Sequence, residues 1–332
     1  MPHNHQQMHD ASVRHDPTGT TRIRLMFDRQ AVKRFRALRT LVKRVVVEMD
    51  VLGLRGITED SLDFLKLYGG DRDKVELAEY SHMPNGEKAR AFMDWLRQAA
   101  SETVGGPVPW SHYLVQAAYS KGYQDAAGRL KNAKKEVPVG LPEERALHAH
   151  TLSMIQTRTH DEIVTVRDTT VAQMARVLAE HLVQGTTPEG LATALVGRID
   201  AIGVTRARLV ASTETVAAYN EAAINMYEEG GIRRLGIIPE WDALLPGTPR
   251  PDYGPGIYKR GERKGEPKRT KDWPKGRWPL VAWATAADDF VCPRCEALED
   301  QVFTLETARG MLPLHPNCRC ALYPLVEQDG EE

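Results

Sequence analysis

The sequence predicts a mainly α-helical protein with a small C-terminal α+β unit. Between residues 21 and 231, apolar residues recur every three or four positions, which is the spacing of one helix face. Short apolar runs typical of strands occur only after Gly230 and Gly231. All four cysteines lie within residues 292–320 and form one local Cys/His cluster. The expected architecture is therefore a helical N-terminal region followed by a domain whose C-terminal unit is held together by this cluster.

The composition is that of a folded protein with about two domains. The chain has 332 residues, 27% of them charged, and a formal net charge of -1. Because the net charge is so small, the chain as a whole is not expected to attract nucleic acid or membrane lipid. Binding of either would require a local charged patch. No apolar run approaches the about 20 residues of a membrane span, and the polar start does not resemble a signal peptide. We expect no membrane partner and assembly in a cytoplasm.

The N-terminal part of the chain divides into a polar terminus and a helical region. Residues 1–20 are polar and rich in histidine, and we expect them to be disordered. Residues 21–137 are expected to form the helical N-terminal region, and its first helix runs from Phe27 to Leu52 with one narrow apolar seam. The seam consists of Phe27, Ala31, Phe35, Leu38, Val42, Val45, Met49 and Leu52.

The other faces of this first helix are strongly basic. Arg29, Lys33 and Arg36 are candidates for contact with phosphates or with an acidic partner surface. The alternative interpretation is the solvated outer face of a bundle helix, because charge runs alone are weak signals. Both interpretations stay open.

Further helices follow from the same apolar spacing and from Gly and Pro breaks, and residues 138–231 form the helical part of the next domain. A break is expected at Gly203. Thr213 and Asn220 fall on the apolar stripe of the last helix, and we expect them to hydrogen-bond the backbone of a neighbouring segment. The helices are expected over residues 59–67, 87–100, 110–135, 161–183, 188–199 and 205–227.

Residues 232–325 are expected to form the small α+β unit, and residues 326–332 an acidic tail. Strands are predicted at Ile232–Ile238, Leu280–Ala284 and Asp289–Val291. The unit contains a basic insertion, residues 246–279, which is either a contact surface for DNA or another subunit, or merely a flexible loop. Its candidate contact residues are Lys259, Arg260, Arg263, Lys264, Lys268 and Arg269.

The Cys/His cluster offers more donors than one tetrahedral metal ion needs. A two-residue spacer lets one turn aim two thiolates at a point, and an extended Cys318–Cys320 segment would point both of its sulfurs to one side. Four of the five donors would bind one structural zinc ion, leaving one spare. Disulfides and buried free thiols remain alternatives, although a reducing cytosol disfavours disulfides. The candidate ligands are Cys292, Cys295, His315, Cys318 and Cys320.

No catalytic pattern accompanies the cluster. The sequence contains no phosphate-binding glycine loop, nucleophile elbow or H-E-x-x-H pattern. A metal-dependent nuclease is disfavoured because no histidine lies between His181 and His315 to complete its ligand set. We therefore expect no enzymatic activity, and no cofactor is required beyond the one possible zinc ion.

Two segments carry a resemblance to a known family. The run WATAADDFVCPRCEALEDQVFTL, a short spacer and LHPNCRCALYPL resemble the phage head-morphogenesis family, the Mu F-like minor capsid proteins. Upstream, ASTETVAAYNEA at residues 211–222 is similar to that family's Thr-Glu helix. Ser212 stands where the family often has Arg, and Asp300 where it has Gly. The resemblance covers about residues 160–325.

The resemblance implies a non-enzymatic virion protein present in few copies. Its expected partners are the portal protein and capsid subunits, together with packaged double-stranded DNA, during prohead assembly and DNA packaging or ejection. Its expected location is the capsid interior or portal vertex. The alternative is a zinc-ribbon-like DNA-binding module, motivated by the same cluster and basic insertion.

Overall fold

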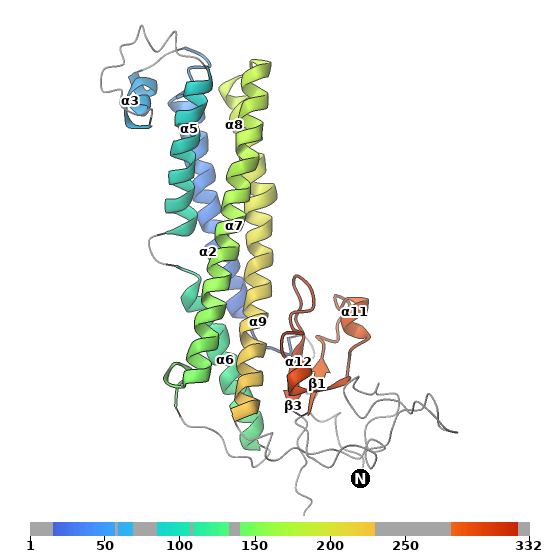
Figure 1. Cartoon of the computed structure of the whole chain (residues 1–332). Coiled ribbons are helices and arrows are strands. Elements are labelled where there is room, and N and C mark those ends of the chain that lie inside the picture. The colour runs from blue at the N-terminus through green and yellow to red at the C-terminus, as the bar shows by residue number, and fades with distance from the viewer. Residues whose placement is uncertain are drawn as a thin grey trace, which may run out of the picture. The chain divides into compact units, whose positions relative to one another are not determined.

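The computed structural model describes residues 16–56, 59–68, 85–106, 109–132, 140–229 and 280–324. These residues are mostly helical and end in a small three-stranded sheet, which confirms the predicted fold class (Figure 1). The predicted strand Ile232–Ile238, the basic insertion 246–279, the tail 326–332 and the first 15 residues lie outside the described residues.

The described helices and strands are as follows. The helices are α2 (Thr21–Lys43), α3 (Glu59–Tyr68), α5 (Asn85–Ala100), α6 (His112–Asn132), α7 (Ala146–Gln184), α8 (Pro188–Arg198), α9 (Thr205–Glu229), α11 (Pro293–Glu296) and α12 (Leu305–Ala308). The strands are β1 (Leu280–Ala284), β2 (Val302–Thr304) and β3 (Ala321–Pro324).

The chain forms two compact units that do not follow the expected linear domains 21–137, 138–231 and 232–325. The first unit combines Met1–Leu25, Tyr113–Thr157 and Ser212–Glu332, and the second combines Met26–His112 with Arg158–Ala211. The reason is that α2, α7 and α9 each continue from one unit into the other, so neither unit is a single stretch of sequence.

The second unit is built on the apolar seam of α2. Phe27, Phe35, Leu38 and Val42 are fully buried, as the seam predicts. The helix was expected to reach Leu52, but a π-helical turn, Arg44–Glu48, ends it. Asp50 then has a left-handed φ of 42°, and its carboxylate accepts the backbone N–H groups of Leu54 and Arg55. This local capping competes with continuation of the helix.

The expected break at Gly203 is instead a π-helical turn, Ile199–Val204, which joins α8 directly to α9. A Cβ atom on Gly203 would lie 2.4 Å from Cδ1 of Phe35. The glycine therefore lets the Phe35 ring pack directly against the backbone, and it does not mark a loop.

Helix α7 begins at Ala146, fifteen residues before the start predicted from sequence. Leu152, Ile155, Thr159 and Ile163 are buried at helical spacing, so the core-facing stripe extends through the earlier segment. The intervening histidines and threonines lowered the apolar signal of that segment, which explains the wrong start.

The C-terminal sheet has the strand order β2-β1-β3, and both pairs are antiparallel. The predicted strand Leu280–Ala284 is confirmed as the central strand β1. The predicted strand Asp289–Val291 is wrong, because these residues lie in a turn closed by a bond from Val291 N–H to the Asp288 carbonyl. Strands β2 and β3 were missed because they have only three and four residues.

In the first unit, α6 and α9 approach each other through Gly122. A Cβ atom on Gly122 would lie 2.1 Å from the carbonyl oxygen of Tyr219, so only glycine fits there. Figure 1 shows the C-terminal part of α9 beside both α6 and the sheet, and Asn220, the residue after Tyr219, donates to the Cys320 carbonyl just before β3.

Gly122→Ala should therefore destabilise the protein by about 1 to 3 kcal/mol, because a backbone carbonyl cannot move away as a side chain can. The matched control is Gly128→Ala on the same helix, where an added Cβ meets nothing within 4 Å. That substitution should stabilise by about 0.5 to 1 kcal/mol. Urea unfolding of both variants measures the two effects, and equal effects would contradict the close approach.

Candidate metal centre

The first two cysteines are placed by a short helical turn. Cys292 is the N-cap of α11 with extended backbone angles, and Pro293 occupies the first helical position, where its fixed φ is favourable. The backbone N–H of Cys295 donates to the Cys292 sulfur at 3.4 Å. The Cys-Pro-Arg-Cys sequence thus folds into a turn that brings two thiols together and stabilises negative charge on the first.

A second turn places His315 and Cys318. The backbone N–H of Cys318 donates to the His315 carbonyl at 3.1 Å, so His315 to Cys318 form a β-turn. Pro316 stands second in this turn, and Asn317 stands third with a left-handed φ of 62°. Pro and Asn at these positions are typical of a type II turn. The His-Pro-Asn-Cys sequence therefore brings His315 and Cys318 back to the same site.

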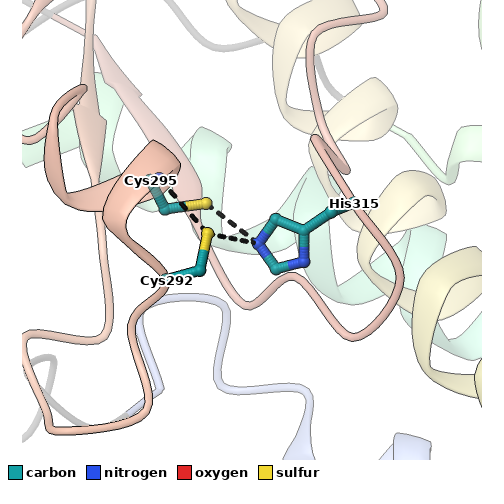
Figure 2. A group of neighbouring side chains, drawn as sticks. All are labelled: Cys292, Cys295 and His315. Atoms are coloured by element: carbon teal, nitrogen blue, oxygen red, sulfur yellow. Dashed lines mark hydrogen bonds between the residues drawn. The ribbon is translucent and has the colours of Figure 1, made fainter.

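The two turns converge on the imidazole of His315 (Figure 2). Its Nε2 atom lies 3.2 Å from the Cys292 sulfur and 3.1 Å from the Cys295 sulfur. The sulfurs of Cys295 and Cys318 are 4.0 Å apart. The donors form two overlapping groups, one of Cys292, Cys295 and His315 and one of Cys295, Cys318 and Cys320, each within 4.8 Å. The described Cys/His cluster can hold a metal ion.

Three of the distances between donors are close to those of a tetrahedral site. With zinc–sulfur bonds of about 2.3 Å and zinc–nitrogen bonds of about 2.0 Å, tetrahedral donors lie about 3.3 to 3.8 Å apart. The distances of 3.1, 3.2 and 4.0 Å fall within a few tenths of an ångström of this range. The Nδ1 atom of His315 also lies 2.8 Å from the Pro316 carbonyl, which can only accept. The proton therefore sits on Nδ1, and Nε2 presents its lone pair to the thiols.

Three of the four sulfurs are shielded from water. Cys295, Cys318 and Cys320 are buried, whereas Cys292 and His315 are half-buried. The hydrogen bond from the Cys320 thiol lowers the pKa of Cys318 to about 5 and raises the pKa of Cys320. Burial and the neighbouring Cys318 raise the pKa of Cys295 to about 12. A metal ion would release protons from such buried thiols, so its affinity should fall with falling pH.

Arg319, between Cys318 and Cys320, pairs with Asp288. Its guanidinium makes two bonds to Asp288, at 2.5 and 2.7 Å. The sulfurs of Cys318 and Cys320 both lie within 4.8 Å of the Cys295 sulfur, so the two side chains face the same site, as expected for an extended segment. The carboxylate of Asp288 lies in the turn before Cys292, so the ion pair joins the two cysteine-bearing segments.

The strand after Cys320 is held by a side chain from α9. Asn220 is buried, donates to the Cys320 carbonyl at 3.1 Å and accepts the N–H of Leu322 at 3.2 Å. The Tyr227 hydroxyl also donates to the Leu322 carbonyl. Because β3 is an edge strand, these side chains provide the hydrogen bonds that another strand would make.

A half-buried arginine reinforces this contact. Arg129 of α6 donates to the hydroxyls of Tyr227 and Tyr219, at 2.8 and 2.9 Å, and stacks 4.0 Å from the ring of Tyr323 in β3. The Tyr219 hydroxyl in turn donates to Asp125. Sequence reasoning missed this cluster, because its tyrosines lie 90 or more residues from Arg129 and none of its members belongs to a motif.

The last five residues of the expected disordered terminus have a defined structure, and Pro17, Thr18 and Thr20 are buried. Thr18 and Thr20 are fully buried, and the Tyr323 hydroxyl donates to the Pro17 carbonyl at 2.9 Å. The Asp16 carboxylate accepts the N–H of Thr21 at the start of α2. Residues 16–20 therefore form a capped turn, and only residues 1–15 of the expected terminus lie outside the description.

The structure places the five predicted metal donors in two groups of three that share Cys295, and it leaves the four cysteines as free thiols. Arg29, Lys33 and Arg36 are exposed on α2. The expectation for Asn220 is confirmed, but Thr213 is only half-buried, and its neighbour Thr215 is fully buried instead. The six candidate residues of the basic insertion, Lys259 to Arg269, lie outside the described part of the chain.

Asp300, where the resembled family has Gly, has a left-handed φ of 58°. Glycine adopts this conformation without strain, and Asp is one of the few other residues that tolerate it. The substitution therefore keeps the turn that precedes β2, and the N–H of Asp300 donates to the Trp283 carbonyl of β1 at 2.9 Å.

Comparisons of the chain with protein-family models, curated proteins and solved structures find no match. Of the helices that the structure describes, none combines the length and the apolar character that a membrane crossing requires.

Asn220→Ala should destabilise the protein by about 2 to 4 kcal/mol, because it leaves a buried carbonyl and a buried N–H without partners. Gln124→Ala, which removes an exposed amide from α6, serves as the control and should change stability by less than about 0.5 kcal/mol. Chemical denaturation of both variants tests this, and a small loss for Asn220→Ala would mean that β3 is held elsewhere.

Proposed function

We propose that the Cys/His cluster binds one structural zinc ion that holds the C-terminal unit in its folded form. Cys292, Cys295, His315 and Cys318 are the proposed ligands, and Cys320 is the spare donor. Cys318 is preferred because it shares a turn with His315 and lies 4.0 Å from the Cys295 sulfur. Zinc would supply the crosslink that this small unit otherwise lacks, since its strands are only three to five residues long.

We further propose that the protein is a non-enzymatic minor capsid protein of the phage head-morphogenesis type. The observation that carries this proposal is the bond of Asn220 to the segment that follows His-Pro-Asn-Cys-Arg-Cys. The two segments of the resemblance are about 100 residues apart in sequence, yet one side chain joins them. Because this bond joins the two segments within one folded domain, it supports the resemblance.

The donor set supports a structural role rather than a catalytic one. A catalytic zinc ion keeps one position open for water or substrate, whereas four protein donors close the coordination sphere. Three of the sulfurs in the cluster are buried, which limits access to an ion bound there. In this proposal the protein acts through its surfaces, by docking on the portal and on capsid subunits inside the head.

Removal of one proposed ligand should abolish zinc binding. Cys295→Ser should reduce the zinc content from one ion per chain to none, and Cys318→Ser should do the same. Cys320→Ser is the matched control and should retain the ion. Elemental analysis of the purified full-length variants measures the content. Loss of zinc in Cys320→Ser but not in Cys318→Ser would show that the ligand set proposed here is incorrect.

The capsid role predicts a defined place in assembled particles. Heads produced from the surrounding capsid genes, with and without this protein, should differ by cross-links between this chain and the portal protein in mass spectrometry. Recovery of the protein outside the particles and bound to DNA would instead favour a DNA-binding module.

A further inference from the structure

Helix α2 concentrates positive charge in a chain whose net charge is close to zero. It contains eight basic residues and one acidic residue, although the whole chain has a net charge of -1. The acidic residue, Asp28, is already paired with Arg208 at 3.0 Å. The helix therefore has no acidic side chain left to neutralise its own arginines and lysines.

The structure divides seven of these eight basic side chains into two groups, and Arg22, exposed in the first turn, belongs to neither. Arg24 lies by Asp16, Arg39 pairs with Asp200 at 3.0 Å, and Arg34 bonds to Gln30. These residues have structural roles. A second group, defined here as the basic face of α2, is exposed and has no acidic partner among the residues that the structure describes; it consists of Arg29, Lys33, Arg36 and Lys43.

The members of the basic face follow one another along a single side of the helix. Their steps of four, three and seven residues match helix periodicity, and the face extends over about 21 Å at 1.5 Å per residue. Like charges three and four residues apart destabilise a helix. The arrangement therefore weakens the isolated helix slightly, and an anionic partner would offset that effect.

The face suits a phosphate backbone better than an acidic protein surface. Between Arg29 and Lys43 the only exposed apolar residue is Ala37. Protein interfaces contain an apolar core, whereas interfaces with DNA are more polar and much more positively charged. Two of the four members are arginines, whose planar fork matches phosphate oxygens.

We propose that the basic face of α2 binds the phosphate backbone of double-stranded DNA without reading its sequence. The side chains contact phosphates and release counterions, and base edges are not involved. The proposal rests on the charges of α2 and does not depend on the zinc ion or on the capsid role.

The test compares two triple variants of the full chain that lose the same charge. Arg29→Gln, Lys33→Gln and Arg36→Gln remove three members of the face. Arg90→Gln, Arg176→Gln and Arg198→Gln remove three exposed arginines from α5, α7 and α8. Fluorescence anisotropy with two duplexes of unrelated sequence, between about 50 and 200 mM NaCl, gives the affinity and its salt dependence.

Loss of the basic face should reduce the slope of log K against log salt concentration by about 2.7, which is 0.9 for each of the three contacts. The effect should be equal for both duplexes, and circular dichroism should show unchanged helix content. The control variant should keep the slope of the natural chain. Residues 246–279 are identical in all three proteins, so their contribution to binding cancels in the comparison.

Two results would overturn the proposal. If both triple variants lose the same slope, the effect is one of net charge and not of this face. If the natural chain does not bind either duplex even at the lowest salt concentration, DNA is not the partner, and an acidic protein surface becomes the candidate.

Discussion

The folded structure of the first unit depends on a few hydrogen bonds at the outer edge of β3. Ala321 and Leu322 are fully buried, so unpaired backbone groups there would cost about 1 to 3 kcal/mol each. Asn220 meets this requirement with one amide, and Tyr227 adds a further bond to the Leu322 carbonyl. The position of β3 on α9 follows from these bonds, and with it the position of the cysteines that immediately precede the strand.

The candidate metal centre and the helices that contact β3 therefore belong to one folded region. Cys318 closes the His315 turn and Cys320 immediately precedes β3, while Arg319 ties the same segment to Asp288. Tyr323 of β3 reaches both Arg129 of α6 and the Pro17 carbonyl. An ion bound by the cluster would order a segment that already contacts three separated parts of the sequence, which makes a structural role consistent with the small size of the sheet.

Local chemistry in the sequence was sufficient to predict the helices, strand β1 and the five donors of the cluster. Cysteine spacing and apolar periodicity each act over a few residues. The missed features depend on distant partners. The Arg129 cluster, the π-helical turn at Gly203 and the edge strand β3 form because residues far apart in sequence pack together, and no local pattern records such contacts.

Zinc-edge X-ray absorption spectroscopy of the purified full chain tests the central claim, that one ion joins both turns through three thiolates and one imidazole. The account predicts three sulfur ligands at about 2.3 Å and one nitrogen ligand at about 2.0 Å. A shell of four sulfur atoms without nitrogen would exclude His315 from the site. A chain without bound metal, with its cysteines oxidised to disulfides, would contradict the proposed centre altogether.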